Sequence, residues 1–199
     1  IYGEILSEVS NENQEEISTI LEQAEKLDFL IQSLVKLSRM ESGIIAVHSE
    51  DTTIKQMLES IQQQFNVKVR EKNITLSLCD TDLHVCCDSK WTVEALGNIV
   101  DNAIKYTACG GNVQIKVEQY SFFVKIDIID DGIGIEKEEI PKIFGRFYRS
   151  LSVADQPGVG IGLFLAREII QAQKGYIKVT SKRGKGSTFS VFLPIAKKE

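Results

Sequence analysis

Asn98-Ile-Val-Asp-Asn-Ala-Ile-Lys-Tyr106 is the stretch with the clearest chemical pattern in the chain. If it is helical, Asn98, Asn102 and Lys105 stand at positions i, i+4 and i+7 and share one face. The apolar side chains fall on the opposite face, where they would pack against a sheet: Leu96, Ile99, Val100, Ala103 and Ile104. Carboxamide oxygens suit a hard cation such as Mg²⁺, and an ammonium suits a phosphate. Because many surface helices have a polar face, the motifs that follow must establish its role.

Three further motifs follow this stretch. Asp130-Asp-Gly-Ile-Gly134 comes after a β-rich run, Phe144-Gly-Arg-Phe-Tyr-Arg149 lies next, and Gly158-Val-Gly-Ile-Gly-Leu163 opens a predicted helix. In this order and spacing, the four blocks resemble the N, G1, F and G2 boxes of the sensor histidine kinase catalytic domain. That domain shares its ATP-binding fold with DNA gyrase B, the Hsp90 chaperones and the MutL repair proteins. The resemblance covers nearly the whole chain and implies that the cofactors are ATP and Mg²⁺.

The elements predicted around these motifs indicate an α/β protein. Residues 113–117 and 123–128 alternate between apolar and polar, as antiparallel strands do when one face is buried. A final hairpin is predicted at 176–180 and 188–193. Helices combined with a mostly antiparallel sheet predict a two-layer α/β sandwich. The resemblance implies the Bergerat ATP-binding fold over residues 44–199, a mixed sheet with helices on one face.

Residues 1–43 are predicted to form a separate helical unit, the remainder of a helical hairpin. A helix from about residue 15 to 40 carries a heptad seam, which needs a partner to cover it: Ile17, Ile20, Ala24, Leu27, Ile31, Leu34 and Ser38. The segment Leu34-Val-Lys-Leu-Ser-Arg-Met-Glu-Ser-Gly43 resembles the end of the second helix of a kinase dimerisation domain. Residues 1–9 resemble the end of the first helix, so the resemblance implies a partial dimerisation domain and a homodimer.

The phosphorylated histidine of that family lies upstream of the position that matches Ile1, so the resemblance implies that it is absent from this sequence. His48 and His84 match no such motif, and we expect them to be structural or surface residues. The chain does not begin with Met, so we expect it to be a fragment of a longer protein. The four cysteines show no CxxC spacing, and we expect free thiols in a reducing cytosol.

The composition is typical of a soluble protein. The 199 residues, of which 43% are apolar and 26% charged, allow one domain of ordinary size plus an appendage. The formal net charge of −5 argues against nucleic acid as a partner. No apolar run approaches the roughly 20 residues of a membrane span. The resemblance implies the cytoplasmic domain of a membrane-anchored bacterial sensor.

Two of the motifs have an evident chemistry. The Asp130 carboxylate can accept a hydrogen bond from the exocyclic amino group of adenine. Gly132 and Gly134 allow close approach of the base to the backbone. The glycines of residues 158–162 lead into a helix whose free N–H groups and dipole bind anions, and the resemblance places the triphosphate there. This loop is not a Walker A motif, because no Gly-Lys-Ser/Thr follows.

The segment between Phe144 and Pro157 resembles the lid that covers ATP in this family. Arg146 and Arg149 are candidates for phosphate contact, although they could also be ordinary solvated arginines. The resemblance implies that the nucleotide is held by Asn98, Asn102, Lys105, Tyr106, Asp130, Gly132, Gly134, Ile135, Phe147, Arg149, Gly158, Gly160, Ile161, Gly162, Leu163 and Thr188. The expected catalytic residues are Asn98, Asn102, Lys105 and Arg146, and the expected Mg²⁺ ligands are Asn98 and Asn102.

Position 98 bears on the reaction. In gyrase-like relatives the matching residue is a glutamate that activates water, whereas the amide of Asn98 cannot accept a proton as a general base does. The resemblance therefore implies a histidine kinase, which transfers the γ-phosphoryl group to a histidine for relay to an aspartate in the receiver domain of a response regulator. This fragment alone is not expected to autophosphorylate, because the acceptor is missing.

Two rival interpretations stay open on the sequence. The first is a degenerate kinase that binds nucleotide without transferring phosphate. The second is a hydrolase of the gyrase and MutL type, against which both Asn98 and the heptad helix argue. An anti-sigma-factor serine kinase would share the boxes but has no such helix.

Overall fold

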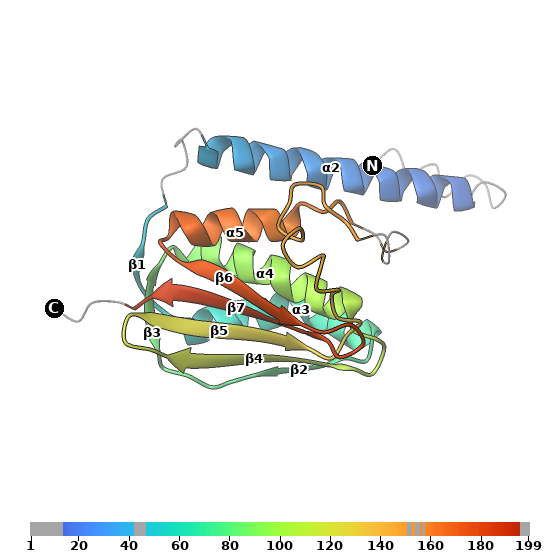
Figure 1. Ribbon diagram of the computed structural model, residues 1–199. Helices are drawn as coiled ribbons and strands as arrows, with labels where there is room; N and C mark the ends of the chain where they lie inside the picture. Colours follow the sequence, from blue (N-terminus) through green and yellow to red (C-terminus); the bar gives the residue numbers. More distant parts are fainter. Residues whose placement is uncertain (1–13, 42–46, 151–152, 154–155, 157, 196–199) are drawn as a thin grey trace.

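The computed structural model describes residues 14–41, 47–150, 153, 156 and 158–195. Helices cover one face of a five-stranded sheet (Figure 1), which confirms the expected α/β sandwich. The elements in chain order are α2 (Gln14–Glu41), β1 (Glu50–Thr53), α3 (Ile54–Glu71), β2 (Thr75–Leu78), β3 (His84–Cys87), α4 (Ser89–Tyr106), β4 (Asn112–Gln119), β5 (Phe123–Asp130), α5 (Gly162–Ala172), β6 (Tyr176–Ser181) and β7 (Ser187–Pro194).

The main sheet has the strand order β2-β4-β5-β7-β6. β2 pairs with β4 in parallel, and the other described pairs of this sheet are antiparallel, as the mixed and mostly antiparallel pattern predicted. β1 and β3 form a separate antiparallel ribbon. The predicted strands at 113–117 and 123–128 are therefore present as β4 and β5 and are joined edge to edge.

β5 shows how the strand period positions the site. Val124, Ile126 and Ile128 are fully buried against the helices. Asp130 stands two residues further along, and side chains on a strand alternate between faces. It therefore points into the same interior from the end of the strand, where it is 8% exposed.

α4 is the central helix of the second layer. The Asp88 side chain caps its first turn by accepting a hydrogen bond from the Trp91 backbone N–H at 3.2 Å. Its buried face contains the predicted apolar residues: Leu96, Ile99, Val100, Ala103 and Ile104. The helix packs against α3 and α5, and its polar side chains lie on the opposite face.

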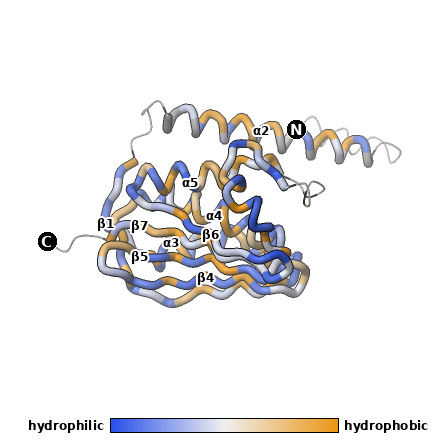
Figure 2. The backbone as a smooth tube through the Cα atoms, in the orientation of Figure 1, coloured by the Kyte–Doolittle hydropathy of each residue, from blue (hydrophilic) through white to orange (hydrophobic). Residues whose placement is uncertain are grey.

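α2 lies beside α5 and the segment that follows residue 144, on the side away from the sheet (Figure 1). Its Lys36 forms an ion pair of 2.6 Å with Glu94 of α4, and Ser33 is buried. Apolar residues recur along α2 (Figure 2) and remain exposed: Ile20, Leu27, Ile31 and Leu34. Among the described elements, α2 alone lacks an extensive contact with another element.

The predicted end of a first helix and the boundary at residues 43 and 44 lie outside the described residues, so the division into two domains stays a prediction. In the part of the chain that the structure covers, no helix has both the length and the apolar character needed to cross a bilayer.

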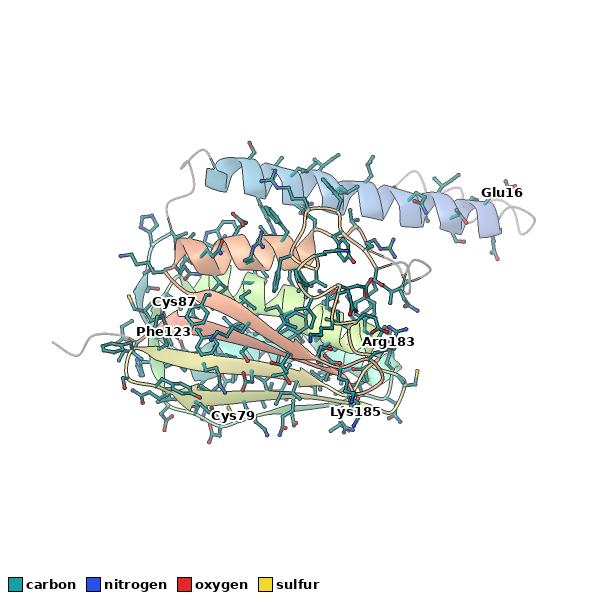
Figure 3. All side chains as sticks on the ribbon, in the orientation of Figure 1. Glu16, Cys79, Cys87, Phe123, Arg183 and Lys185 are labelled. Atoms are coloured by element: carbon teal, nitrogen blue, oxygen red, sulfur yellow. The ribbon has the colours of Figure 1, made fainter. Side chains whose placement is uncertain are left out.

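The histidines and cysteines lie at scattered positions. His84 contacts Asp51, with 2.7 Å between Nδ1 and Oδ1, and His48 is exposed. The four cysteines are free thiols. Cys79 and Cys87 lie apart in Figure 3, and Cys87 is buried with its Sγ 4.0 Å from the sulfur of Met57.

Candidate functional site

A cavity opens where α4, the loop after β5, residues 139–150 and 153, the glycine-rich loop and the start of β7 meet. Its walls combine charged and amide groups with apolar side chains. The lining residues are Asn98, Asp101, Asn102, Ala103, Lys105, Tyr106, Asp130, Ile133, Gly134, Ile135, Glu139, Ile143, Tyr148, Arg149, Ser150, Val153, Gly158, Val159, Gly160, Ile161, Gly162, Leu163, Ser187 and Phe189.

The polar face of α4 forms one wall. Asn98, Asn102 and Lys105 all line the cavity, as their helical spacing predicted. The Asn98 amide Nδ2 donates to the carbonyl of Glu94 at 3.0 Å, which orients its Oδ1 toward the start of α5. A Cβ atom at Gly162 would lie 3.0 Å from this Oδ1, so glycine allows the two helices to approach closely here.

The Asp130 carboxylate lines the cavity from the end of β5. Its Oδ1 accepts hydrogen bonds from the backbone N–H of Gly132 at 2.9 Å and of Ser187 at 3.2 Å. Both bonds go to Oδ1, and Oδ2 is the oxygen that we expect to accept a hydrogen bond from a ligand. Burial raises the pKa of Asp130 above the usual aspartate value, against the opposing effect of the two N–H donors.

Of the two glycines expected to contact the base, the structure places Gly134 in the cavity lining but not Gly132. Gly132 is not among the lining residues: a Cβ atom there would lie 2.5 Å from the carbonyl oxygen of Tyr106. Gly134, with a φ of +66°, lines the cavity, and a side chain there would clash with the carbonyl of Lys182. These glycines allow the end of α4, this loop and the β6–β7 turn to meet.

Lys105 and the glycine-rich loop lie next to each other in the cavity lining. A Cβ atom at Gly158 would lie 2.7 Å from the Lys105 Nζ, so the ammonium reaches this loop. The loop leads into α5, whose first-turn N–H groups lack intrahelical acceptors. Burial and, next, the positive charge of Arg149 lower the pKa of Lys105. An ammonium beside free N–H groups and a guanidinium is suited to bind a polyanion.

The two arginines predicted after Phe144 lie in different environments. Arg149 lines the cavity and donates to the carbonyls of Val153 and Gln156. The Arg146 guanidinium instead lies over the Phe164 ring, 4.6 Å from its centre, outside the lining. Phe147 is 52% exposed and is also outside the lining. The structure therefore brings Arg149 to the cavity but not Arg146 or Phe147.

At β7 the sequence predicted Thr188 as a binding residue, but its neighbour Ser187 is the one that lines the cavity. Thr188 is outside the lining, whereas Ser187 belongs to it and lies on the face of buried Phe189 and Val191. The alternation along this strand could have identified Ser187. Other lining residues carried no such signal, because they lie in irregular backbone: Ile133, Glu139, Ile143, Tyr148, Ser150, Val153 and Val159.

Asp131 points away from the cavity. Its carboxylate accepts hydrogen bonds from the backbone N–H and the side-chain amide of Asn112, at 2.9 and 2.8 Å. These bonds hold the pKa of Asp131 below its usual value and join the loop after β5 to the start of β4. The second carboxylate of the motif therefore supports the loop and does not line the site.

Comparison with known proteins agrees with this geometry. The family described as histidine kinase-, DNA gyrase B-, and HSP90-like ATPase matches residues 87–197. The chain is 33% identical over 202 residues to the sensor histidine kinase WalK of Bacillus subtilis. This match covers 97% of the chain and 33% of WalK, so the chain spans about a third of the length of that relative.

Solved structures show the same relationship. The histidine kinase AdeS of Acinetobacter baumannii matches with a TM-score of 0.72 and 25% identity, over 97% of this chain and 90% of that one. Full-length ShkA in complex with AMPPNP matches with a TM-score of 0.82 over 99% of this chain and 42% of that one. Its identity of 20% makes this a similarity of fold alone.

The family match spans more than half of the chain and contains the polar face of α4, Asp130 and the glycine-rich loop. The named relatives among these comparisons are sensor histidine kinases. The chain therefore belongs to the histidine kinase-, DNA gyrase B- and HSP90-like ATPase family, as a catalytic ATP-binding domain of the sensor histidine kinase type.

Proposed function

We propose that the chain binds Mg·ATP in this cavity and transfers the γ-phosphoryl group to a histidine of a dimerisation domain, for relay to an aspartate of a response regulator. The observation that carries the proposal is the convergence of four groups on one cavity. These are Asp130, the two asparagines of α4, Lys105 and the glycine-rich loop before α5.

Two groups of lining residues suit the two ends of ATP. Asp130 offers a fixed acceptor beside apolar side chains, which suits the amino group and flat face of adenine. Lys105, Arg149 and the N-terminus of α5 offer positive charge and N–H donors, which suit the triphosphate. The residues of this chain would thus bind and orient the nucleotide from both ends.

Asn98 and Asn102 would hold Mg²⁺, which when bound neutralises charge on the phosphate groups. The donor chemistry fits, because both side chains line the cavity and the Asn98 amide nitrogen already donates to Glu94. Within the described residues, no group of three or more His, Cys, Asp or Glu could hold a metal. A cation here would take its other ligands from phosphates and water, as Mg²⁺ commonly does.

The chemistry of position 98 favours transfer over hydrolysis. An amide cannot take a proton from an attacking water, so the nucleophile must be supplied by another group. In the proposed reaction a histidine nitrogen forms a bond to the γ-phosphorus, the bond to the bridging oxygen breaks, and ADP leaves. Lys105 and Arg149 would orient the phosphates for this step.

The exposed seam of α2 supports a homodimer in the whole protein. Ile20, Leu27, Ile31 and Leu34 are between 45% and 66% exposed, and their heptad spacing suits a second helix of the same kind. A bacterial sensor with this arrangement would be anchored in the membrane by segments outside this sequence.

A phosphotransfer assay tests the proposal. The chain should phosphorylate a separately supplied dimerisation domain that carries the acceptor histidine, because the nucleotide site is present and the nucleophile is not. The measurement is transfer of label from γ-labelled ATP, with an acid-labile and base-stable product expected for phosphohistidine. A dimerisation domain with His→Ala at the acceptor is the control.

Two results would contradict the proposal. ADP formation without labelled histidine would indicate a hydrolase, and nucleotide binding with neither product would indicate a binding module.

The charge of Lys105 predicts a dependence of ADP affinity on pH. Its pKa lies below the usual lysine value of 10.5, so the phosphate-binding charged form is lost earlier in the alkaline range. Bound phosphate favours the charged form, so ADP affinity should fall as pH rises through this pKa. Titration calorimetry between about pH 7 and pH 10 checks this. Lys105→Met should bind ADP weakly, and its affinity should not fall with pH. Lys90→Met, at an exposed position of α4, should show the same fall in ADP affinity with pH as the wild type. A flat wild-type profile would contradict the assigned role.

A further inference from the structure

Lys72 connects α3 to the last turn of α4. It is the C-terminal cap residue of α3, yet its ammonium does not bind the carbonyls of its own helix. The Nζ donates to the carbonyl oxygens of Ile104 at 2.8 Å, Lys105 at 2.9 Å and Thr107 at 2.8 Å. The three hydrogens of one ammonium thus bind three carbonyls at the end of the neighbouring helix.

These carbonyls need an external partner. The last four C=O groups of an α-helix have no intrahelical donor, and the C-terminus carries a partial negative charge of roughly half an elementary charge. Lys72 supplies both donors and positive charge at that point. Its own carbonyl oxygen also accepts a hydrogen bond from Gly110 at 3.1 Å, which fixes the chain that leaves α4.

The turn that Lys72 holds is part of the nucleotide site. Lys105 and Tyr106 line the cavity from this turn. The Tyr106 carbonyl accepts a hydrogen bond from the Ile133 N–H at 3.2 Å and lies against Gly132. The end of α4 is therefore held by Lys72 through some of its carbonyls and contacts the Asp130 loop through another.

We infer that Lys72 is a positioning residue of the nucleotide site: by holding the last turn of α4, it sets the places of Lys105, Tyr106 and the loop that carries Asp130. The inference rests on the proposed binding of ATP. Loss of the ammonium would leave three carbonyls without their donor and release the turn. ADP affinity should then fall even in molecules that remain folded.

Lys72→Met tests this, because methionine keeps an unbranched stem of similar length and removes the charge. We expect ADP affinity to fall by about tenfold or more, which corresponds to about 1.4 kcal/mol. Lys72→Arg should recover part of the affinity, because the charge remains, while the planar guanidinium cannot direct three N–H groups from one nitrogen to the three carbonyls. Lys55 is also a residue of α3 and forms an exposed ion pair with Asp80. Lys55→Met removes this pair and should change ADP affinity by less than about twofold.

A merely structural effect needs a separate control. Ile61→Val removes a methyl group from the buried face of α3 and should cost about 0.5–1.5 kcal/mol of stability. Titrations are made at temperatures where the melting curves show every variant folded. The amide signal of Ile133 in NMR spectra should shift in Lys72→Met and stay in place in Ile61→Val, because Ile133 donates to the last turn of α4.

The outcomes separate the inference from the proposed function. The inference is supported if Lys72→Met binds ADP more weakly and shifts the Ile133 signal. Lys55→Met and Ile61→Val should then keep the ADP affinity of the wild type, and Ile61→Val should also keep its Ile133 signal. Wild-type binding by folded Lys72→Met, or an equal loss in Ile61→Val, overturns it while the proposed function stands. Absence of ADP binding by the wild type would overturn the proposed function and the inference together.

Discussion

Asp130→Asn should reduce ADP affinity by about 100-fold or more, the largest effect of any substitution in the cavity that preserves shape. The asparagine carbonyl oxygen can replace Oδ1 and keep the hydrogen bonds from Gly132 and Ser187. The NH₂ group then occupies the place of Oδ2 and presents a donor to the amino group of adenine. A donor facing a donor loses the hydrogen bond and leaves both groups without a partner.

Titration calorimetry of ADP and of a non-hydrolysable ATP analogue, with and without Mg²⁺, measures this effect. Asp131→Asn is the matched control, because it makes the same chemical change one residue away at a carboxylate that binds Asn112 and lies outside the cavity lining. It should change ADP affinity only slightly. If Asp130→Asn bound ADP as tightly as the wild type, the assignment of the adenine end would be wrong.

Asn102→Ala should reduce phosphotransfer to a supplied histidine by at least about 100-fold, as expected when one electrostatic contact to a developing charge is removed. The side chain lines the cavity one helical turn from Asn98, and alanine removes its oxygen without disturbing α4. Binding of the ATP analogue should also lose its dependence on Mg²⁺, because one of the two proposed ligands is gone.

The rate of label transfer and the Mg²⁺ titration are measured on the same preparations. Asn66→Ala, at an exposed position of α3, makes the same substitution away from the cavity and should behave like the wild type. Full transfer and unchanged Mg²⁺ dependence in Asn102→Ala would remove this residue from the proposed metal site.

The parts of the site on regular elements were predictable because their periods are fixed. Asn98, Asn102 and Lys105 were placed on one face by the period of 3.6 residues, and the structure shows them lining one cavity. Asp130 follows the two-residue period of a strand with apolar neighbours at 126 and 128. The same rule applied to β7 would have selected Ser187 in place of Thr188.

The segment after Phe144 could not be predicted in this way. Arg146, Phe147 and Arg149 lie within four positions of one another, and no helix or strand fixes which of them faces the cavity. The backbone at Phe147 adopts a positive φ of 60°, which redirects the chain between the two arginines. Only the path of the backbone shows that Arg149 reaches the cavity while Arg146 packs on Phe164.

The ion pair between Lys36 and Glu94 bears on how firmly α2 is held against α4. Both side chains are partly exposed, at 38% and 26%, and pairs of this kind contribute on the order of 1 kcal/mol or less. A contact of this strength therefore adds little to the free energy that holds α2 against α4, and dissolved salt weakens it further.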